Sequence, residues 1–341
     1  MQFGTRSIVF WWSASFVLII TMLVALSIGR YPMAISDVLR LLWDRATSGD
    51  GASDEVSRRV VELVRTPRVL LSSIVGAGLG VAGAALQGVF RNPLVAPDIL
   101  GIAPGAAFGG AVAILLSGDP TLTILSAFVF GIVAILAVSV IGRFGGLGST
   151  LTLVLAGVIT GAFFSALVSL TTFIADVESE LPAILYWLLG SFAGADFGKL
   201  GLALATVLPA VGLIYALRFR INVLALGDTE ARGLGLAVAP LRWTVLVGVT
   251  VIVAGSVAVA GIVGWIGLVV PHLARLCVGP DHRLLLPASA LVGAFLLVLI
   301  DTICRSATAS EIPLSVLTAI VGAPIFVMAL RRAGRLGWGH G

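Results

Sequence analysis

The sequence predicts an all-α, polytopic membrane protein with about ten transmembrane helices, built as a single domain over residues 1–341. Of the 341 residues, 59% are hydrophobic and only 11% are charged, whereas soluble domains carry about 25% charged residues. The mean hydropathy is +1.12, and the apolar residues occur in runs of about 20, the length that crosses a bilayer. A soluble domain and a disordered tail are thereby excluded. The two cysteines, Cys277 and Cys304, argue against a disulfide scaffold.

The predicted spans follow one another with mostly short connections. They lie at residues 8–29, 69–89, 99–117, 121–142, 151–175, 200–217, 243–262, 265–278, 284–302 and 313–330. The uncharged run from Trp243 to Pro271 would measure about 44 Å as one helix, longer than a hydrocarbon core of about 30 Å. Glycines near its middle therefore divide it into two spans. The first run is too long for the core of a signal peptide and predicts an uncleaved helix.

The distribution of arginine predicts the orientation. With ten spans both termini share one side, which holds twelve arginines and only four acids, Asp98, Asp228, Glu230 and Asp281. The opposite side holds nine basic and thirteen acidic residues. Because basic residues accumulate in cytoplasmic loops, both termini are predicted in the cytoplasm. The arginines stand singly or in pairs, so no nucleic-acid partner is expected.

The first outer loop, residues 30–68, is predicted to be periplasmic and partly helical. Val56, Val60, Leu63 and Val64 recur at helical spacing. We expect this helix to lie along the membrane surface, with its arginines facing outward.

Two glycine motifs look chemical and have simpler explanations. Gly78-x-Gly80-x-x-Gly83 fits the dinucleotide pattern but lies inside an apolar span, without the strand that the pattern requires. Close packing of helices through small residues explains it better. The single lysine, Lys199, is followed by leucine and lacks the P-loop spacing. The chain is therefore not expected to be an enzyme, and any ATP energy must come from a partner.

Other candidate sites in the spans are sparse. His272 and Cys277 have no third metal ligand nearby, so no metal is expected. Asp301 is the one acid close to apolar mid-chain sequence. A secondary transporter or channel, the alternative class, predicts ionisable groups at membrane depth or an inverted repeat with matching broken helices. A membrane scaffold, the third class, leaves the broken spans unexplained.

Three segments outside the long spans are distinctive. Residues 87–101 form a proline-fixed turn with uncharged polar groups at Gln87 and Asn92. Residues 221–235 predict a very short cytoplasmic helix capped by Asp228, which presents apolar residues to a partner. Residues 264–283 contain Pro271, which predicts a kinked or unwound span.

Together these segments resemble the FecCD family, the permease subunits of ABC importers for iron chelates, haem and cobalamin. The similarity also includes Arg65-Thr-Pro-Arg68, Trp187-Leu-Leu-Gly-Ser191, Gly267-Leu-Val-Val-Pro-His272 and Asp301…Arg305. It implies a type II ABC importer permease fold that works as a homodimer. Two ATPase subunits, which hold ATP and magnesium, would dock below, and a periplasmic or lipid-anchored binding protein would dock above.

The resemblance also implies roles for particular residues. ATPase coupling falls within the cytoplasmic loop 218–242, on Leu224, Leu226, Gly227, Asp228, Glu230, Ala231, Gly233, Leu234 and Gly235. Docking of the binding protein falls on Arg65, Arg68 and Arg305. The cytoplasmic gate falls on Gln87, Asn92, Pro93, Ser149 and Thr150. The chain is thus expected in a bacterial inner membrane, with ferric siderophore as the first candidate cargo and haem, cobalamin and oxyanions such as molybdate behind it.

Overall fold

The regular elements of the computed structural model are helices throughout the residues it describes, 5–47, 55–144 and 150–335. Seven of them are long and apolar enough to cross a membrane: α1 (Thr5–Ser27), α4 (Thr66–Phe90) with the segment preceding it, α6 (Pro120–Phe144), α7 (Thr150–Ile174), α9 (Phe197–Ala216), α12 (Val238–Ala260) and α14 (His282–Ser306). Three shorter apolar stretches are α5 (Ile102–Leu116), α13 (Ile266–Val278) and the part Leu314–Met328 of α15 (Leu314–Arg335). Each predicted run coincides with one of these ten helices. The number that crosses a membrane stays a prediction.

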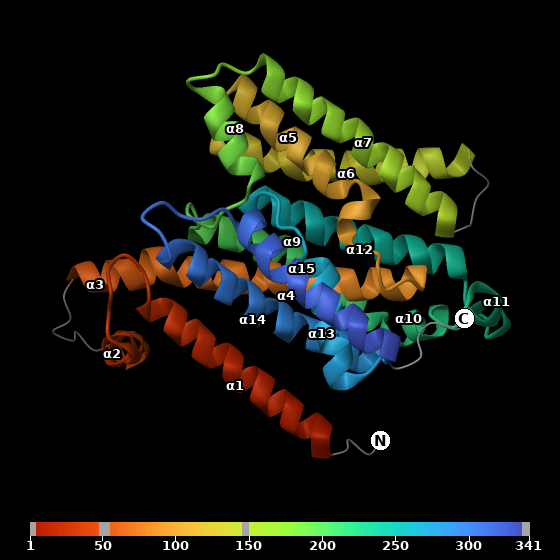
Figure 1. Cartoon of the computed structure of the whole chain (residues 1–341), viewed down its shortest axis with the longest axis horizontal. Helices are drawn as coiled ribbons and strands as arrows, with labels where there is room; N and C mark the ends of the chain where they lie inside the picture. Colours follow the sequence, from red (N-terminus) through yellow and green to blue (C-terminus); the bar gives the residue numbers. More distant parts are fainter. Residues whose placement is uncertain (1–4, 48–54, 145–149, 336–341) are drawn as a thin grey trace.

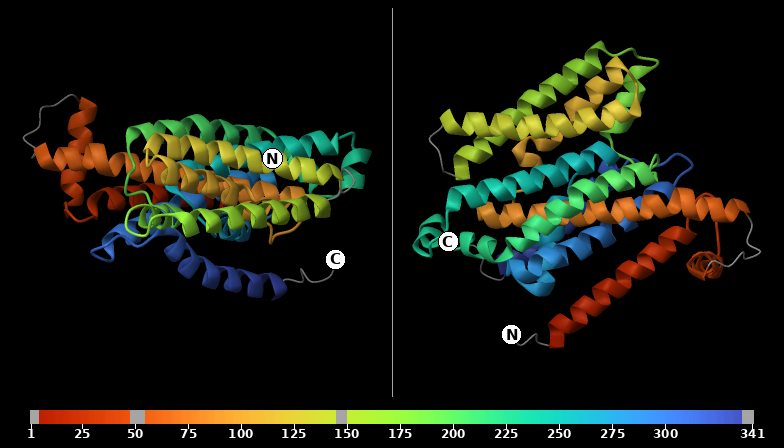
Figure 2. Two further views of the ribbon diagram at one scale, coloured as in Figure 1. Left: turned by 90° about the horizontal axis from the view of Figure 1, so that it is seen from above. Right: turned by 180° about the vertical axis from the view of Figure 1, so that it is seen from behind.

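The long helices run broadly along one axis of the molecule in two groups (Figures 1 and 2). One group contains α5, α6, α7 and the short α8 (Glu180–Leu188); the other contains α4, α9 and α12 to α15, with α1 at its edge. Helix α12 packs against both α6 and α9 and so joins the groups. Helices α2 (Ile35–Thr47) and α3 (Glu55–Arg59) lie at one end of the molecule, here called the outer end. Helices α10 (Arg218–Leu224) and α11 (Asp228–Gly233) lie at the opposite end, here called the cytoplasmic end after the predicted orientation.

Helix α4 forms the centre of the second group because its glycines let neighbouring backbones approach. A Cβ added at Gly83 would lie 1.8 Å from the carbonyl oxygen of Gly267, and one at Gly76 would lie 2.3 Å from that of Gly293. Gly80 meets the carbonyl of Ser289 in the same way. These contacts confirm that the glycine pattern serves helix packing.

The outer extension of α4 corrects one prediction. Helix α3, the π-helical η1 (Val60–Arg65) and α4 follow without a break, so Glu55–Phe90 is one 36-residue helical rod. Val56, Leu63 and Val64 are indeed exposed. Arg65, however, faces inward and is 3% exposed. The segment is therefore an extension of α4 whose last arginine points into the protein.

The break between α12 and α13 lies where the glycines predicted it, between the predicted spans 243–262 and 265–278. Helix α12 ends at Ala260, and residues 261–265 are irregular. Pro271 lies inside α13 without ending it. The irregular backbone is thus placed before Pro271, and it contains Trp265 at φ 67°, a conformation that costs free energy in a bulky residue.

Candidate functional site

The predicted coupling segment, residues 224–235, projects from the end of the bundle opposite α2 and α3. Helix α11 is six residues long, and its N-cap is Gly227 at φ 144°, so the predicted cap Asp228 is instead the first helical residue. The Asp228 carboxylate accepts hydrogen bonds from Arg242 at 2.8 and 2.9 Å. Because Arg242 belongs to α12, this ion pair attaches α11 to a long helix of the bundle.

The leucines of the coupling segment divide into two kinds. Leu226 and Leu234 are 64% and 66% exposed, whereas Leu224 is fully buried. The prediction that Leu224 is presented to a partner is therefore wrong, because α10 turns it into the core together with Ile221. Ala231 is buried as well. The remaining predicted coupling residues are Glu230 in the first turn of α11, Gly233 at its last residue, and Gly235 at φ 80°.

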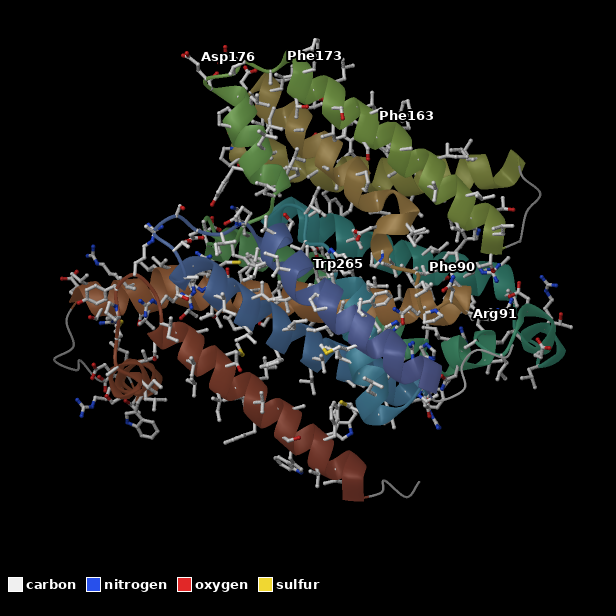
Figure 3. All side chains as sticks on the ribbon, in the orientation of Figure 1. Phe90, Arg91, Phe163, Phe173, Asp176 and Trp265 are labelled. Carbon is white, nitrogen blue, oxygen red and sulfur yellow. The ribbon has the colours of Figure 1, made fainter. Side chains whose placement is uncertain are left out.

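The turn that follows α4 contacts this segment. Figure 3 shows Phe90 and Arg91 at the cytoplasmic end of α4, and Arg91 adopts φ 52° as its C-cap. A Cβ built on Gly227 would lie 3.4 Å from Nη1 of Arg91. The inner end of α4 and the coupling segment are therefore neighbours.

The predicted gate residues are partly gathered in the same turn. The Gln87 side chain is buried; its Oε1 accepts from Nη2 of Arg275 at 2.9 Å. The exposed Asn92 accepts from the backbone N–H of Leu94 at 2.9 Å, which fixes the turn at Pro93. Thr150 is the first residue of α7, and Ser149 lies outside the described residues. The gate role of all five stays a prediction.

The segment after Asn92 returns into the bundle. Its 3-10 helix η2 (Pro97–Leu100) carries Asp98, which the charge count had placed on the cytoplasmic side. Pro97 meets Gly267, whose added Cβ would lie 2.6 Å from Pro97 Cδ and 3.4 Å from the carbonyl oxygen of Leu79. Leu79 lies eleven residues before the end of α4, about 16 Å from the cytoplasmic end at 1.5 Å per residue. Asp98 is therefore near half depth.

At the outer end, Arg65, Arg68 and Arg305 form a buried arginine cluster. Arg68 is 6% exposed and bonds two carboxylates, with Nη2 at 2.8 Å from Asp301 Oδ1 and 2.9 Å from Glu311 Oε2. Burial alone raises the pKa of Glu311, but the hydrogen bond and charge of Arg68 outweigh it and hold that pKa below its usual range. This network joins α4, α14 and the loop that precedes α15.

The other two arginines bond backbone carbonyls. Arg65 donates to the carbonyl oxygens of Leu26 and Ser27 at 2.6 and 2.9 Å, and Arg305 donates to that of Ala25. The cluster thus caps the outer end of α1, where the last turn leaves carbonyls unpaired. The structure brings the three predicted docking arginines together, but it buries all of them.

Sequence reasoning missed a second polar network at the cytoplasmic end. Asn222 of α10 donates to Asp281 at 2.5 Å and accepts from the backbone N–H of the buried His282 at 2.8 Å. Asp281 also accepts from Nε of Arg283 at 2.7 Å. Hydrogen bonding to Arg283, with Asn222 adding to it, lowers the pKa of Asp281 to about 2. The helix-capping position of Asp281 before an apolar run was the available signal.

The fold is that of a membrane permease of the ABC importer class, as its similarity to known proteins shows. A family model described as the FecCD transport family matches residues 17–332. The permease protein of a molybdate import system from Haemophilus influenzae is 42% identical, covering 93% of this chain and 95% of the relative. The permease protein of a hemin transport system from Yersinia pestis is 37% identical, covering 92% and 94%.

A solved structure agrees with the sequence relatives. It is described as an inward-facing conformation of a metal-chelate type ABC transporter and is 40% identical. It superposes with a TM-score of 0.85 over 94% of this chain and 98% of that chain. The chain belongs to the FecCD transport family, and the predicted resemblance is confirmed.

Proposed function

We propose that this permease carries a metal chelate inward through a homodimer driven by two separate ATPase subunits that hold ATP and magnesium. Ferric siderophore is the first candidate cargo, with haem, cobalamin and an oxyanion such as molybdate as the others. The observation that carries the proposal is the coupling segment. It exposes Leu226 and Leu234 at the cytoplasmic end while the Asp228–Arg242 pair ties it to α12. Exposed leucines on a tethered helix suit docking into a protein groove.

The membrane arrangement is part of the same proposal. Seven long and three shorter apolar helices are available for ten spans, and the arginine bias favours cytoplasmic termini in a bacterial inner membrane. Helix α7 exposes Phe163 and Phe173 at 60% and 85%, and both point away from the bundle in Figure 3. Such an apolar face suits either lipid or the second copy of the permease.

We further propose that a binding protein docks at the outer arginine cluster by competing with the internal partners of these arginines. Because Arg65, Arg68 and Arg305 already have internal partners, an incoming acidic side chain must replace one of those partners. The variant Arg305→Gln separates the two roles. Loss of binding-protein affinity at an unchanged thermal midpoint supports docking, whereas loss of both indicates a purely structural arginine.

The function is tested by purifying the tagged chain from its native membrane in mild detergent and identifying its companions by mass spectrometry. A P-loop ATPase at one copy per permease supports the importer. The complex is then reconstituted in liposomes with its binding protein. Uptake that needs an ion gradient and no ATPase would instead establish a secondary transporter.

The coupling role is tested by Leu226→Glu and Gly227→Arg in the same liposomes. We expect ATP-dependent uptake to fall at least tenfold (roughly 1.4 kcal/mol of coupling), because each change disturbs the surface offered to the ATPase. Val177→Glu is the matched control, since Val177 is 72% exposed at the outer end. Normal uptake by both coupling variants contradicts the assignment.

A further inference from the structure

Residues 91–101, which return into the bundle after α4 and are here called the returning segment, lie near half depth between the two helix groups. On one side Pro97 packs against Gly267 of α13, and the carbonyl oxygen of Leu79 of α4 lies near the same glycine. On the other side the carbonyl of Ile99 would lie 2.4 Å from a Cβ added to Gly157 of α7. Both contacts require glycine, so the position of η2 is fixed by close backbone packing. Asp98 is held in place with it.

A small cavity opens beside Asp98. Its lining combines the returning segment with α4, α12 and the irregular 261–265 break, and it includes Leu79, Pro97, Asp98, Ser256, Val257 and Val263. Two irregular backbone segments therefore meet around one hollow. At membrane depth such backbone is tolerated where it lines a cavity.

Asp98 is the one acidic residue in this lining. Its side chain is exposed, and within residues 5–47, 55–144 and 150–335 it makes no hydrogen bond or ion pair. The Ser256 hydroxyl is occupied, because it donates to the carbonyl of Ile252 at 2.7 Å. A carboxylate at this depth without a protein partner is costly unless water reaches it, and such residues mark pathways for substrates or ions.

We propose that Asp98 selects cargo by charge: it places a negative charge on the passage, which favours neutral or cationic metal chelates over oxyanions. This inference rests on the proposed permease function and narrows its cargo class. In the homodimer the charge is present twice. A fixed charge at the narrow, weakly screened part of a path changes the local concentration of charged solutes.

The test measures the charge of the passage directly, without knowledge of the cargo. Gly264→Cys supplies the probe, since a Cβ built on Gly264 meets nothing within 4 Å and its neighbour Val263 lines the cavity. The exposed Cys277 is replaced by serine, while Cys304 is buried and stays. The complete importer in liposomes is treated with a cationic and an anionic methanethiosulfonate reagent, with and without ATP, and the two modification rates are compared.

We expect Asp98→Asn to lower the ratio of cationic to anionic modification by about fivefold or more. Glu178→Gln, a neutralisation in the outer loop that precedes α8, is the control and leaves the ratio unchanged. An unchanged ratio in Asp98→Asn overturns the proposal. So does the absence of modification in both nucleotide states, because the cavity is then not on a water-filled path.

ATP-dependent uptake is recorded in the same liposomes. If the unsubstituted importer takes up its cargo while the ratio does not respond to Asp98→Asn, only the charge-selector inference fails. If uptake by the unsubstituted importer needs no ATPase, the proposed function fails, whatever the ratio shows.

Discussion

The two ends of the molecule use charged residues in opposite ways. At the outer end, Arg65, Arg68 and Arg305 are 3% to 6% exposed, and each bonds a carboxylate or a backbone carbonyl of the same chain. At the cytoplasmic end, the Asp228–Arg242 pair fixes a helix that leaves two leucines exposed. The outer charges hold helices together, whereas the inner pair presents a surface. A basic residue that sequence predicts to dock a partner is therefore not necessarily exposed for docking.

The largest loss of stability is expected when the outer arginine cluster is broken. Arg68→Ala leaves the buried Asp301 and the half-buried Glu311 without their cation, and removing one partner of a buried pair costs about 3–5 kcal/mol. Thermal unfolding of the detergent-solubilised permease measures the loss. Arg68→Met combined with Asp301→Asn is expected to recover part of it, because the main uncompensated charge is gone. If Arg68→Ala were as stable as the unsubstituted chain, the cluster would not hold the outer end together.

A smaller effect is expected from Asp228→Ala at the cytoplasmic end. Arg242 is 3% exposed but Asp228 is 22% exposed, so water compensates part of the loss, and we expect about 1–3 kcal/mol. The readout is hydrogen exchange, which should rise in α11 and the start of α12 while α14 stays protected. Exchange that rises at the outer end instead would contradict the separation of the two ends.

The cytoplasmic end is also expected to lose stability in acid. The pKa of Asp281 is lowered to about 2 from an ordinary 3.8. Its contribution to stability is therefore present above about pH 4 and is lost as the pH falls toward 2. The side chain is 29% exposed, so solvent screening limits the contribution to under about 1 kcal/mol. Asp281→Asn should remove this part of the pH dependence of unfolding, and identical pH profiles would contradict the role of the carboxylate.

The smallest effect is expected at the outer surface. Arg59 bonds Glu55 at 2.5 Å, one helical turn away, with both side chains more than 70% exposed. Such pairs contribute about 0.3–0.5 kcal/mol. Arg59→Ala in the same unfolding assay is the matched control for Arg68→Ala. A comparable loss in both variants would mean that burial does not set the strength of these pairs.

Much of the fold could be predicted from sequence because apolar runs and arginine bias are strong, additive signals. All ten predicted runs coincide with helices, and the glycines of α4 pack against α13 and α14 as expected. The glycines also located the break between α12 and α13, which lies at residues 261–265. Pro271, by contrast, lies inside α13 without ending it.

The site was less predictable because side-chain direction depends on tertiary contacts. The carbonyls of α1 and the carboxylate of Asp301 draw Arg65 and Arg68 inward, and their partners are about 40 to 230 residues away in sequence. Asp98 looked like part of a cytoplasmic turn, since nothing local shows that the chain folds back after Pro93. Likewise, the burial of Leu224 follows from the packing of α10 against α14 and α4.

The length of the helical rod Glu55–Phe90 has a mechanical consequence. At 1.5 Å per residue its 36 residues extend roughly 50 Å, so it is long enough to cross a hydrocarbon core of about 30 Å and continue beyond it. Its outer half carries Arg65 and Arg68, and its inner end places Arg91 against Gly227. If a stiff helix of this length tilts by about 5° about its midpoint, each of its ends moves by about 2 Å. The π-helical turn η1 is the one place in the rod where its winding changes. Because kinks concentrate at π-helical turns, we expect a load on the outer end of the rod to bend it at η1.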